Sequence, residues 1–95
     1  MYRLDKNIIW LLRESQRKTI FLSLPKEPFM PNKLRKELND KKEVSLSLRE
    51  MSRHLRDFKK RGLVNCINKK DPYNKIYAIT NKGLKTTQKL KKVEN

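Results

Sequence analysis

Cysteine, histidine and glycine are all scarce in this chain. Its 95 residues include one cysteine, Cys66, one histidine, His54, and 2 glycines. A single cysteine excludes an intrachain disulfide and favours a reducing compartment, and one Cys with one His cannot form a structural zinc site. There is no glycine-rich phosphate loop, and no nucleophile or paired carboxylate stands at a recognisable spacing from His54. We therefore expect no enzyme activity, no metal and no cofactor.

Long hydrophobic runs are also missing. The apolar run at residues 8–12 is too short for the core of a signal peptide or for a membrane span. We expect a soluble, cytoplasmic protein without a membrane partner. The length suits a single domain over residues 1–95.

Negative charge is the third deficit. The chain has 25 Lys and Arg against 10 Asp and Glu, a formal net charge of +15 at pH 7. Such an excess repels itself in a compact fold unless a polyanion neutralises it, and the usual polyanions are nucleic acid and anionic membrane surfaces. Solubility alone is the alternative explanation, so the position of the charges has to decide.

The N-terminal part of the chain predicts helices that proline interrupts. Residues 5–24 have the pattern of a helix in two pieces that meet near Ser15, with Asp5 as the N-cap of the first piece and Ser15 as that of the second. Three prolines between residues 25 and 31 end this helix.

A short helix follows the prolines. Pro31 suits its first turn, and Leu34 and Leu38 share one face of it. Residues 39–43 are polar and charged, and we expect a turn there.

The clearest helix begins at Ser47. Ser47 and Glu50 form the Ser-x-x-Glu pattern of a capping box directly ahead of an apolar periodic run. The helix is expected to continue to about Arg61, where Gly62 suits a left-handed C-terminal cap.

After Gly62 the period changes from that of a helix to that of a strand. Residues 63–68 and 75–80 are rich in Val, Ile and Tyr and flank a polar segment, which predicts a β-hairpin with a basic tip. Thr80 suits the N-cap of a last helix over residues 81–92. The predicted fold class is mainly α with a small β-hairpin.

The helix that begins after Ser47 separates apolar from cationic side chains. At about 100° per residue, the two kinds fall on opposite stripes. The inward stripe holds Leu48, Met51, Leu55 and Phe58. The outward stripe holds Arg49, Arg53, Arg56 and Lys60. A merely solvated face would mix charges of both signs, so the purely positive stripe favours contact with a polyanion. His54 lies beside both stripes, a position more typical of packing than of ligand binding.

The cationic stripe suits double-stranded DNA. A helix fits the major groove, where arginine pairs with guanine, and residues near the start of the helix usually contact base edges. Later residues meet phosphates and fix the register. We therefore assign base edges to Arg49 and Arg53, with Ser52 beside them, and phosphates to Arg56 and Lys60.

Two motifs resemble those of MarR/ArsR-like winged helix-turn-helix regulators. MSRHLRDF at residues 51–58, followed by RGLV at 61–64, resembles the recognition helix of this family and its next strand. IYAITNKG at 76–83 is similar to the second strand of the family's wing and its exit. The resemblance spans most of the chain and implies a winged helix-turn-helix regulator that binds DNA, often as a dimer.

The resemblance also implies roles for segments. The helix-turn-helix would occupy residues 31–61 and the wing residues 63–80. The basic wing tip would lie along the DNA backbone or the minor groove through Lys69, Lys70, Tyr73 and Lys75. Residues 38–46 are longer than the family's usual turn, and the cysteine pairs of its metal-sensing members are absent, so metal sensing does not carry over.

Residues 1–14 carry more apolar surface than one helical face can bury. One face holds Leu4, Ile8, Leu11 and Leu12. Ile9 and Trp10 project elsewhere, and we expect a twin subunit to cover them, unless the segment wraps its own domain. A dimer would recognise a pseudo-palindromic target.

Three functions therefore compete. A sequence-specific DNA-binding transcriptional regulator leads because the capped helix carries a cationic face. A nonspecific DNA- or RNA-binding protein is second, since the charge alone favours any polyanion. A winged helix used for protein–protein contact is third.

Overall fold

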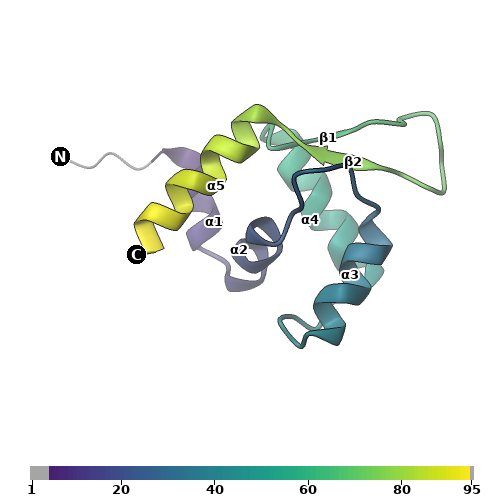
Figure 1. Cartoon of the computed structure of the whole chain (residues 1–95), viewed down its shortest axis with the longest axis horizontal. Helices are drawn as coiled ribbons and strands as arrows, with labels where there is room; N and C mark the ends of the chain where they lie inside the picture. Colours follow the sequence, from purple (N-terminus) through teal and green to yellow (C-terminus); the bar gives the residue numbers. More distant parts are fainter. Residues whose placement is uncertain (1–4, 95) are drawn as a thin grey trace.

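The structure, a computed structural model, describes residues 5–94 and contains helices and one hairpin. The elements are α1 (Lys6–Leu12), α2 (Ser15–Leu22), α3 (Pro31–Asp40), α4 (Leu48–Lys60), β1 (Val64–Cys66), β2 (Tyr77–Ile79) and α5 (Asn81–Glu94). The predicted class, mainly α with a small hairpin, is confirmed. Figure 1 shows the loop between β1 and β2 extending away from the helices, whereas α1 and α5 lie at the opposite end.

The hairpin is antiparallel but shorter than the sequence predicts. Val64 pairs with Ile79 and Cys66 with Tyr77, so each strand has three residues. The edge of β2 is partly covered by the proline-rich connection, because Phe29 and Tyr77 exchange two backbone hydrogen bonds of 2.8 and 2.9 Å. This contact fixes the hairpin against the start of α3.

One core joins the helices, and Phe58 of α4 lies at its centre. The ring of Phe58 packs edge-on against Phe21 of α2 and Trp10 of α1, with centroid distances of 5.4 and 5.8 Å. It also stacks on His54, one turn earlier in α4, at 6.4 Å. Leu90 of α5 is fully buried in the same core.

Of the face predicted for the first helix, Ile8 and Leu11 are buried, but Leu12 at its end is 40% exposed, so its placement with them is wrong. Leu4 lies outside the described residues.

Most of the predicted helix starts are confirmed. The Asp5 carboxylate accepts from the backbone N–H of Ile8 at 2.9 Å, and Pro31 occupies the first turn of α3. Ser15 as a cap is wrong: Ser15 is the first residue of α2, and Glu14 holds the N-cap position. The Glu14 carboxylate makes no cap hydrogen bond because it pairs with Arg17 at 3.1 Å.

The Asn39 side chain holds the long connection between α3 and α4 through hydrogen bonds to backbone groups. Helix α3 runs on to Asp40, so the predicted turn over residues 39–43 begins later than expected. The Asn39 amide donates to the carbonyl of Leu46 at 2.9 Å and accepts from its N–H at 3.0 Å. Leu46 is thereby drawn into the core. This is why a segment longer than the usual turn still lets the two helices pack.

Two helices end in the same left-handed geometry with different residues. Gly62 (φ 76°) follows α4 and Lys42 (φ 60°) follows α3. At each end the paired hydrogen bonds of a Schellman motif form: Leu63 N–H donates to Phe58 O, and Glu43 N–H donates to Leu38 O. The predicted cap at Gly62 is confirmed.

The start of α5 is packed directly on the end of α4. The Thr80 hydroxyl accepts from Gly83 N–H at 3.0 Å, which confirms the predicted cap, and donates to the Gly62 carbonyl at 2.6 Å. A Cβ at Gly83 would overlap the carbonyl oxygen of Leu63, so this close approach requires glycine. Both glycines of the chain thus lie at one junction.

Residues 5–94 contain neither a membrane-spanning helix nor a cluster of metal ligands. No helix there combines the length and the apolarity needed to cross a bilayer. No group of three or more His, Cys, Asp or Glu side chains lies close enough together to hold a metal ion.

We predict opposite stability effects at the two left-handed positions. Lys42→Gly should raise the free energy of unfolding and Gly62→Ala should lower it, each by about 1 kcal/mol, because a Cβ is strained at positive φ. Lys41→Gly is the matched control: Lys41 has φ −78°, so glycine there should destabilise. Urea unfolding measures all three, and a Lys42→Gly variant no more stable than Lys41→Gly would contradict the assignment.

Candidate nucleic-acid interface

The outward face of α4 is exposed as predicted. Its polar residues Arg49, Ser52, Arg53, Arg56 and Lys60 are all solvent-exposed. Met51, Leu55 and Phe58 are buried, which confirms three of the four predicted inward residues. Within residues 5–94, no ion pair neutralises the four cations of the stripe. This face therefore presents its positive charge to solvent.

Leu48 was predicted to point inward, and this is wrong. Its side chain is 47% exposed. Leu48 is the first residue of α4 and lies where the helix leaves the core, and Leu46 of the connection is buried in its place. His54, predicted beside both stripes, is 1% exposed and completes the inward face.

Glu50 is the acidic residue nearest the start of the cationic stripe, and the cap engages it. Its carboxylate accepts from Ser47 N–H at 3.0 Å, while the Ser47 hydroxyl accepts from Glu50 N–H at 3.2 Å. The predicted capping box is confirmed. The hydrogen bond from Ser47 N–H lowers the pKa of Glu50. The negative charge is thus bound at the helix start, where the helix dipole favours it.

Side-chain hydrogen bonds fix the conformation of the loop between β1 and β2. One Asp71 carboxylate oxygen accepts from the N–H groups of Asn74 and Tyr73, both at 2.9 Å, and these bonds lower the pKa of Asp71. The Asn68 side chain continues the hydrogen bonding of the hairpin into the loop. Its amide oxygen accepts from Ile76 N–H and its amide nitrogen donates to Asn74 O, both at 2.6 Å. The tip is therefore ordered by its own side chains.

The predicted wing residues differ in solvent exposure. Lys69 and Lys70 are exposed, and Tyr73 is 90% exposed. Lys75 is partly buried, and its ammonium donates to the Lys69 carbonyl at 3.2 Å. Lys75 thus holds the loop closed, in addition to carrying charge.

A groove of about 570 Å³ lies between α4, the start of α3 and the hairpin loop. We call it the α4–wing groove. Its walls bring together four predicted contact residues, Ser52, Arg56, Tyr73 and Lys75. Arg49, Arg53, Lys60, Lys69 and Lys70 lie outside it.

Lys59 also lines this groove, although it was not among the predicted contact residues. Lys59 is exposed and follows Ser52 by seven residues and Arg56 by three. That helical spacing was sufficient to find it. Asn32, at the start of α3, also lines the groove, but the sequence offered no sign of it because it comes from a different element.

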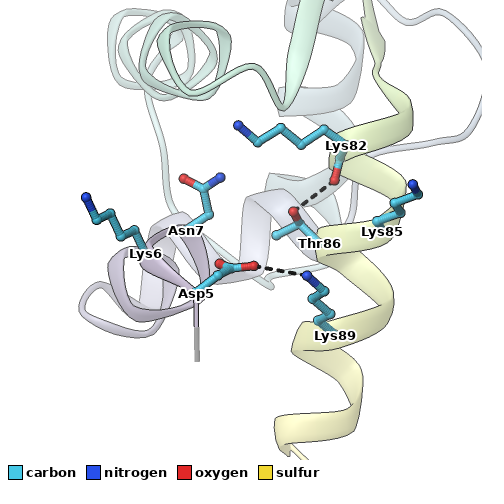
Figure 2. A pocket seen from close by; sticks show the side chains of 7 residues that line it. All are labelled: Asp5, Lys6, Asn7, Lys82, Lys85, Thr86 and Lys89. Atoms are coloured by element: carbon cyan, nitrogen blue, oxygen red, sulfur yellow. Dashed lines mark hydrogen bonds and ion pairs between the residues drawn. The ribbon is translucent and has the colours of Figure 1, made fainter. Parts of the chain in front are cut away.

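A second basic hollow, of about 490 Å³, lies between α1 and α5. Figure 2 shows Lys82 and Lys89 of α5 extending toward α1, with Lys6 and Lys85 on either side. Lys89 pairs with Asp5 at 3.4 Å. These lysines belong to other elements than the α4–wing groove, and the sequence analysis gave them no role.

Trp10 has an intrachain role in addition to any role between subunits. Two guanidinium groups lie over its ring, that of Arg17 at 4.1 Å and that of Arg61 at 4.0 Å from the centroid. Arg61 also donates to the Asn7 side chain at 3.1 Å. Ile9, by contrast, is 41% exposed. A dimer contact through these residues stays a prediction.

His54 is held neutral behind the cationic face. Its Nε2 lies 2.9 Å from the Gln16 amide oxygen, and its Nδ1 is buried with no partner among the described residues. Burial lowers the pKa of His54, although Glu14, 3.8 Å from Nε2, acts in the opposite direction. Arg53 and Arg17 add to the lowering, and Asp57 opposes it.

Solved structures share this fold. No protein-family profile and no curated protein matches the chain. YodB from B. subtilis, a transcriptional regulator in its reduced form, superposes with a TM-score of 0.73 at 16% identity, over 99% of this chain and 88% of its own. A complex of hsRosR, hsRosR-S1, gives 0.72 at 21% identity, over 85% and 71%. A PadR family transcriptional regulator from Eggerthella lenta gives 0.61 at 24% identity, over 92% and 75%.

These likenesses establish the fold. The chain has the winged helix-turn-helix fold: α3 and α4 form the helix pair, and the hairpin of β1 and β2 is the wing. The predicted fold is confirmed.

We predict that His54 makes stability depend on pH. Its pKa is lower folded than unfolded, so the unfolded chain binds the proton more readily and acid favours unfolding. The stabilisation is fully present above the ordinary histidine value of 6.5 and is lost as the pH falls below it. Thermal unfolding between roughly pH 8 and pH 5 measures the loss, and His54→Gln should flatten the curve.

The carboxylates with lowered pKa values do not contribute to the change in stability over this pH range. Asp5, Glu50 and Asp71 have pKa values below their ordinary 3.8, 4.5 and 3.8, so their contributions are lost only in stronger acid. An equal pH slope in the native chain and in His54→Gln would show that His54 is not the group responsible.

Proposed function

We propose that this chain is a sequence-specific transcriptional regulator that binds double-stranded DNA, with α4 in the major groove and the wing on the backbone or minor groove. The exposed cationic face of α4 carries the proposal. It lies on a helix with a complete capping box and an apolar back, so its side chains project from a rigid element. Regulators with this fold, YodB and the PadR family protein, support the assignment.

The roles of the residues follow from their positions. Arg49 and Arg53 lie in the first half of α4, where base edges are within reach, and each guanidinium fits the two acceptors of guanine. Arg56 and Lys60 lie further along and suit phosphates. On the wing, Lys69 and Tyr73 extend from the loop that Asp71 orders.

Charge alone supports the competing function, nonspecific binding of DNA or RNA. A net charge of +15 attracts any polyanion, and this attraction falls steeply with salt. What favours specific binding is the placement of two arginines on one helical face, since bidentate pairing discriminates between bases.

We predict that Arg49→Ala with Arg53→Ala removes specific binding. A duplex motif is first selected from random DNA at near-physiological salt. Binding of the double variant to that motif should weaken by at least about thirtyfold, because two base contacts are lost, while binding to scrambled duplex falls modestly. Fluorescence anisotropy measures both.

The control removes the same charge elsewhere. Lys6→Ala with Lys85→Ala takes two cations from the α1–α5 hollow and should lower both affinities by a similar, salt-dependent factor. If the arginine variant behaves like this control, or if no motif is selected, binding is nonspecific and the proposal fails.

We further predict a homodimer through α1. Ile9 is 41% exposed on this helix and Trp10 is partly exposed, and a twin subunit would cover them. Ile9→Asp should convert the dimer to a monomer in sedimentation velocity and weaken binding to a two-fold symmetric motif. Ile67→Asp, at an apolar residue of the wing that is 56% exposed, should leave the mass unchanged. A native chain that sediments as a monomer at micromolar concentration would rule out the dimer.

A further inference from the structure

Apolar side chains gather inside the cationic α4–wing groove. Among the described residues, six large hydrophobic side chains are exposed: Ile9, Leu12, Met30, Leu48, Ile67 and Tyr73. Three of these line this one groove, Met30 at 42% exposure, Leu48 at 47% and Tyr73 at 90%. Arg56 and Lys59 lie on the same walls. The surface proposed to meet DNA is thus partly apolar.

Leu48 is the apolar residue best placed on the recognition helix. It is the first residue of α4, beside Arg49 and one turn ahead of Ser52. The capping box of Ser47 and Glu50 fixes the backbone on both sides of it. Its exposure is therefore a property of a rigid helix start, where side chains of recognition helices contact base edges.

The chemistry of the major groove indicates what such a side chain recognises. Phosphates require cations, and guanine, adenine and cytosine present hydrogen-bonding groups on their groove edges. Thymine alone adds an apolar group, its 5-methyl. We propose that Leu48 contacts a thymine methyl group and makes α4 select T·A pairs at that position, with Met30 and Tyr73 as the apolar surroundings. This inference rests on the proposed binding of double-stranded DNA.

The same contact would let the protein distinguish DNA from RNA. Uracil lacks the methyl group, and the major groove of an A-form helix is too deep and narrow for side chains to reach the bases. A groove with cations alone would accept either polyanion, whereas the leucine gains contact only with DNA. Leu48 therefore bears directly on the competing function of RNA binding.

Replacement of thymine by uracil in DNA is the test. The probes are the duplex motif selected from random DNA and the same duplex with dU in place of dT, titrated by anisotropy at near-physiological salt. The native chain should bind the dT duplex tighter by roughly fourfold for each methyl group contacted. Leu48→Ala should bind both duplexes equally, since its short side chain no longer reaches the methyl group.

Ile67→Ala is the matched control. It shortens an aliphatic side chain that is 56% exposed and lies outside the α4–wing groove, so it should keep the full preference for dT. Circular dichroism confirms that both variants remain helical.

Each outcome decides a different claim. Failure of the native chain to select or bind any duplex would overturn the proposed DNA-binding function itself. Equal binding of the dT and dU duplexes by the native chain would overturn the thymine contact and leave DNA binding intact. A preference that survives in Leu48→Ala would show that another residue senses the methyl group, and would equally overturn the role of Leu48.

Discussion

The burial of Phe58 is the contact on which this structure depends. Its ring meets Phe21 and Trp10 from two other helices and His54 from its own, so it fixes the rotation of α4 about its axis. Removal of such a ring from a core costs about 3–5 kcal/mol, a large part of the stability of a small domain. Because the apolar stripe can face only this core, the arginines on the other side must face outward. The candidate site is therefore a consequence of the packing behind it.

The domain also has to assemble around very few acidic residues. It does so by giving several cations partners other than carboxylates. Arg17 and Arg61 both lie over the ring of Trp10, and Arg17 donates to the Trp10 carbonyl. The amide of Asn39 and the carboxylate of Asp71 satisfy backbone groups of loops. Acidic side chains are thus engaged in caps, turns and a few ion pairs, and the four cations of the α4 stripe form no ion pair among the described residues.

Local patterns predicted what local chemistry determines. The capping box at Ser47 and Glu50, proline at the start of α3 and glycine after α4 are each decided within one turn of helix, and each is confirmed. The exposure of Arg49, Arg53, Arg56 and Lys60 followed from helical period alone.

Other predictions failed where distant segments compete for one position. Leu48 is displaced from the core by Leu46, which the Asn39 amide holds across the α3–α4 connection. Ser15 loses the cap position to Glu14, whose carboxylate is engaged by Arg17. The lining of the α4–wing groove by Asn32 and Met30 depends on how the wing lies against α3, through the backbone pairing of Phe29 and Tyr77. None of these is visible in the spacing of residues along a single helix.

The charge state of His54 links the packing of α4 on the core to the charge on the outer face of this helix. His54 neighbours Arg53 in sequence and faces Glu14 and Gln16 of α2. A protonated ring there would add a buried cation to a helix whose outer face already holds Arg49, Arg53 and Arg56, and the single carboxylate of Glu14 is shared with Arg17. Burial disfavours the charged ring and lowers the pKa of His54, which stacks on Phe58. The helix thus keeps its charge on one side only: a neutral, aromatic back lets α4 dock on the core, and the unpaired charge remains where a polyanion can reach it.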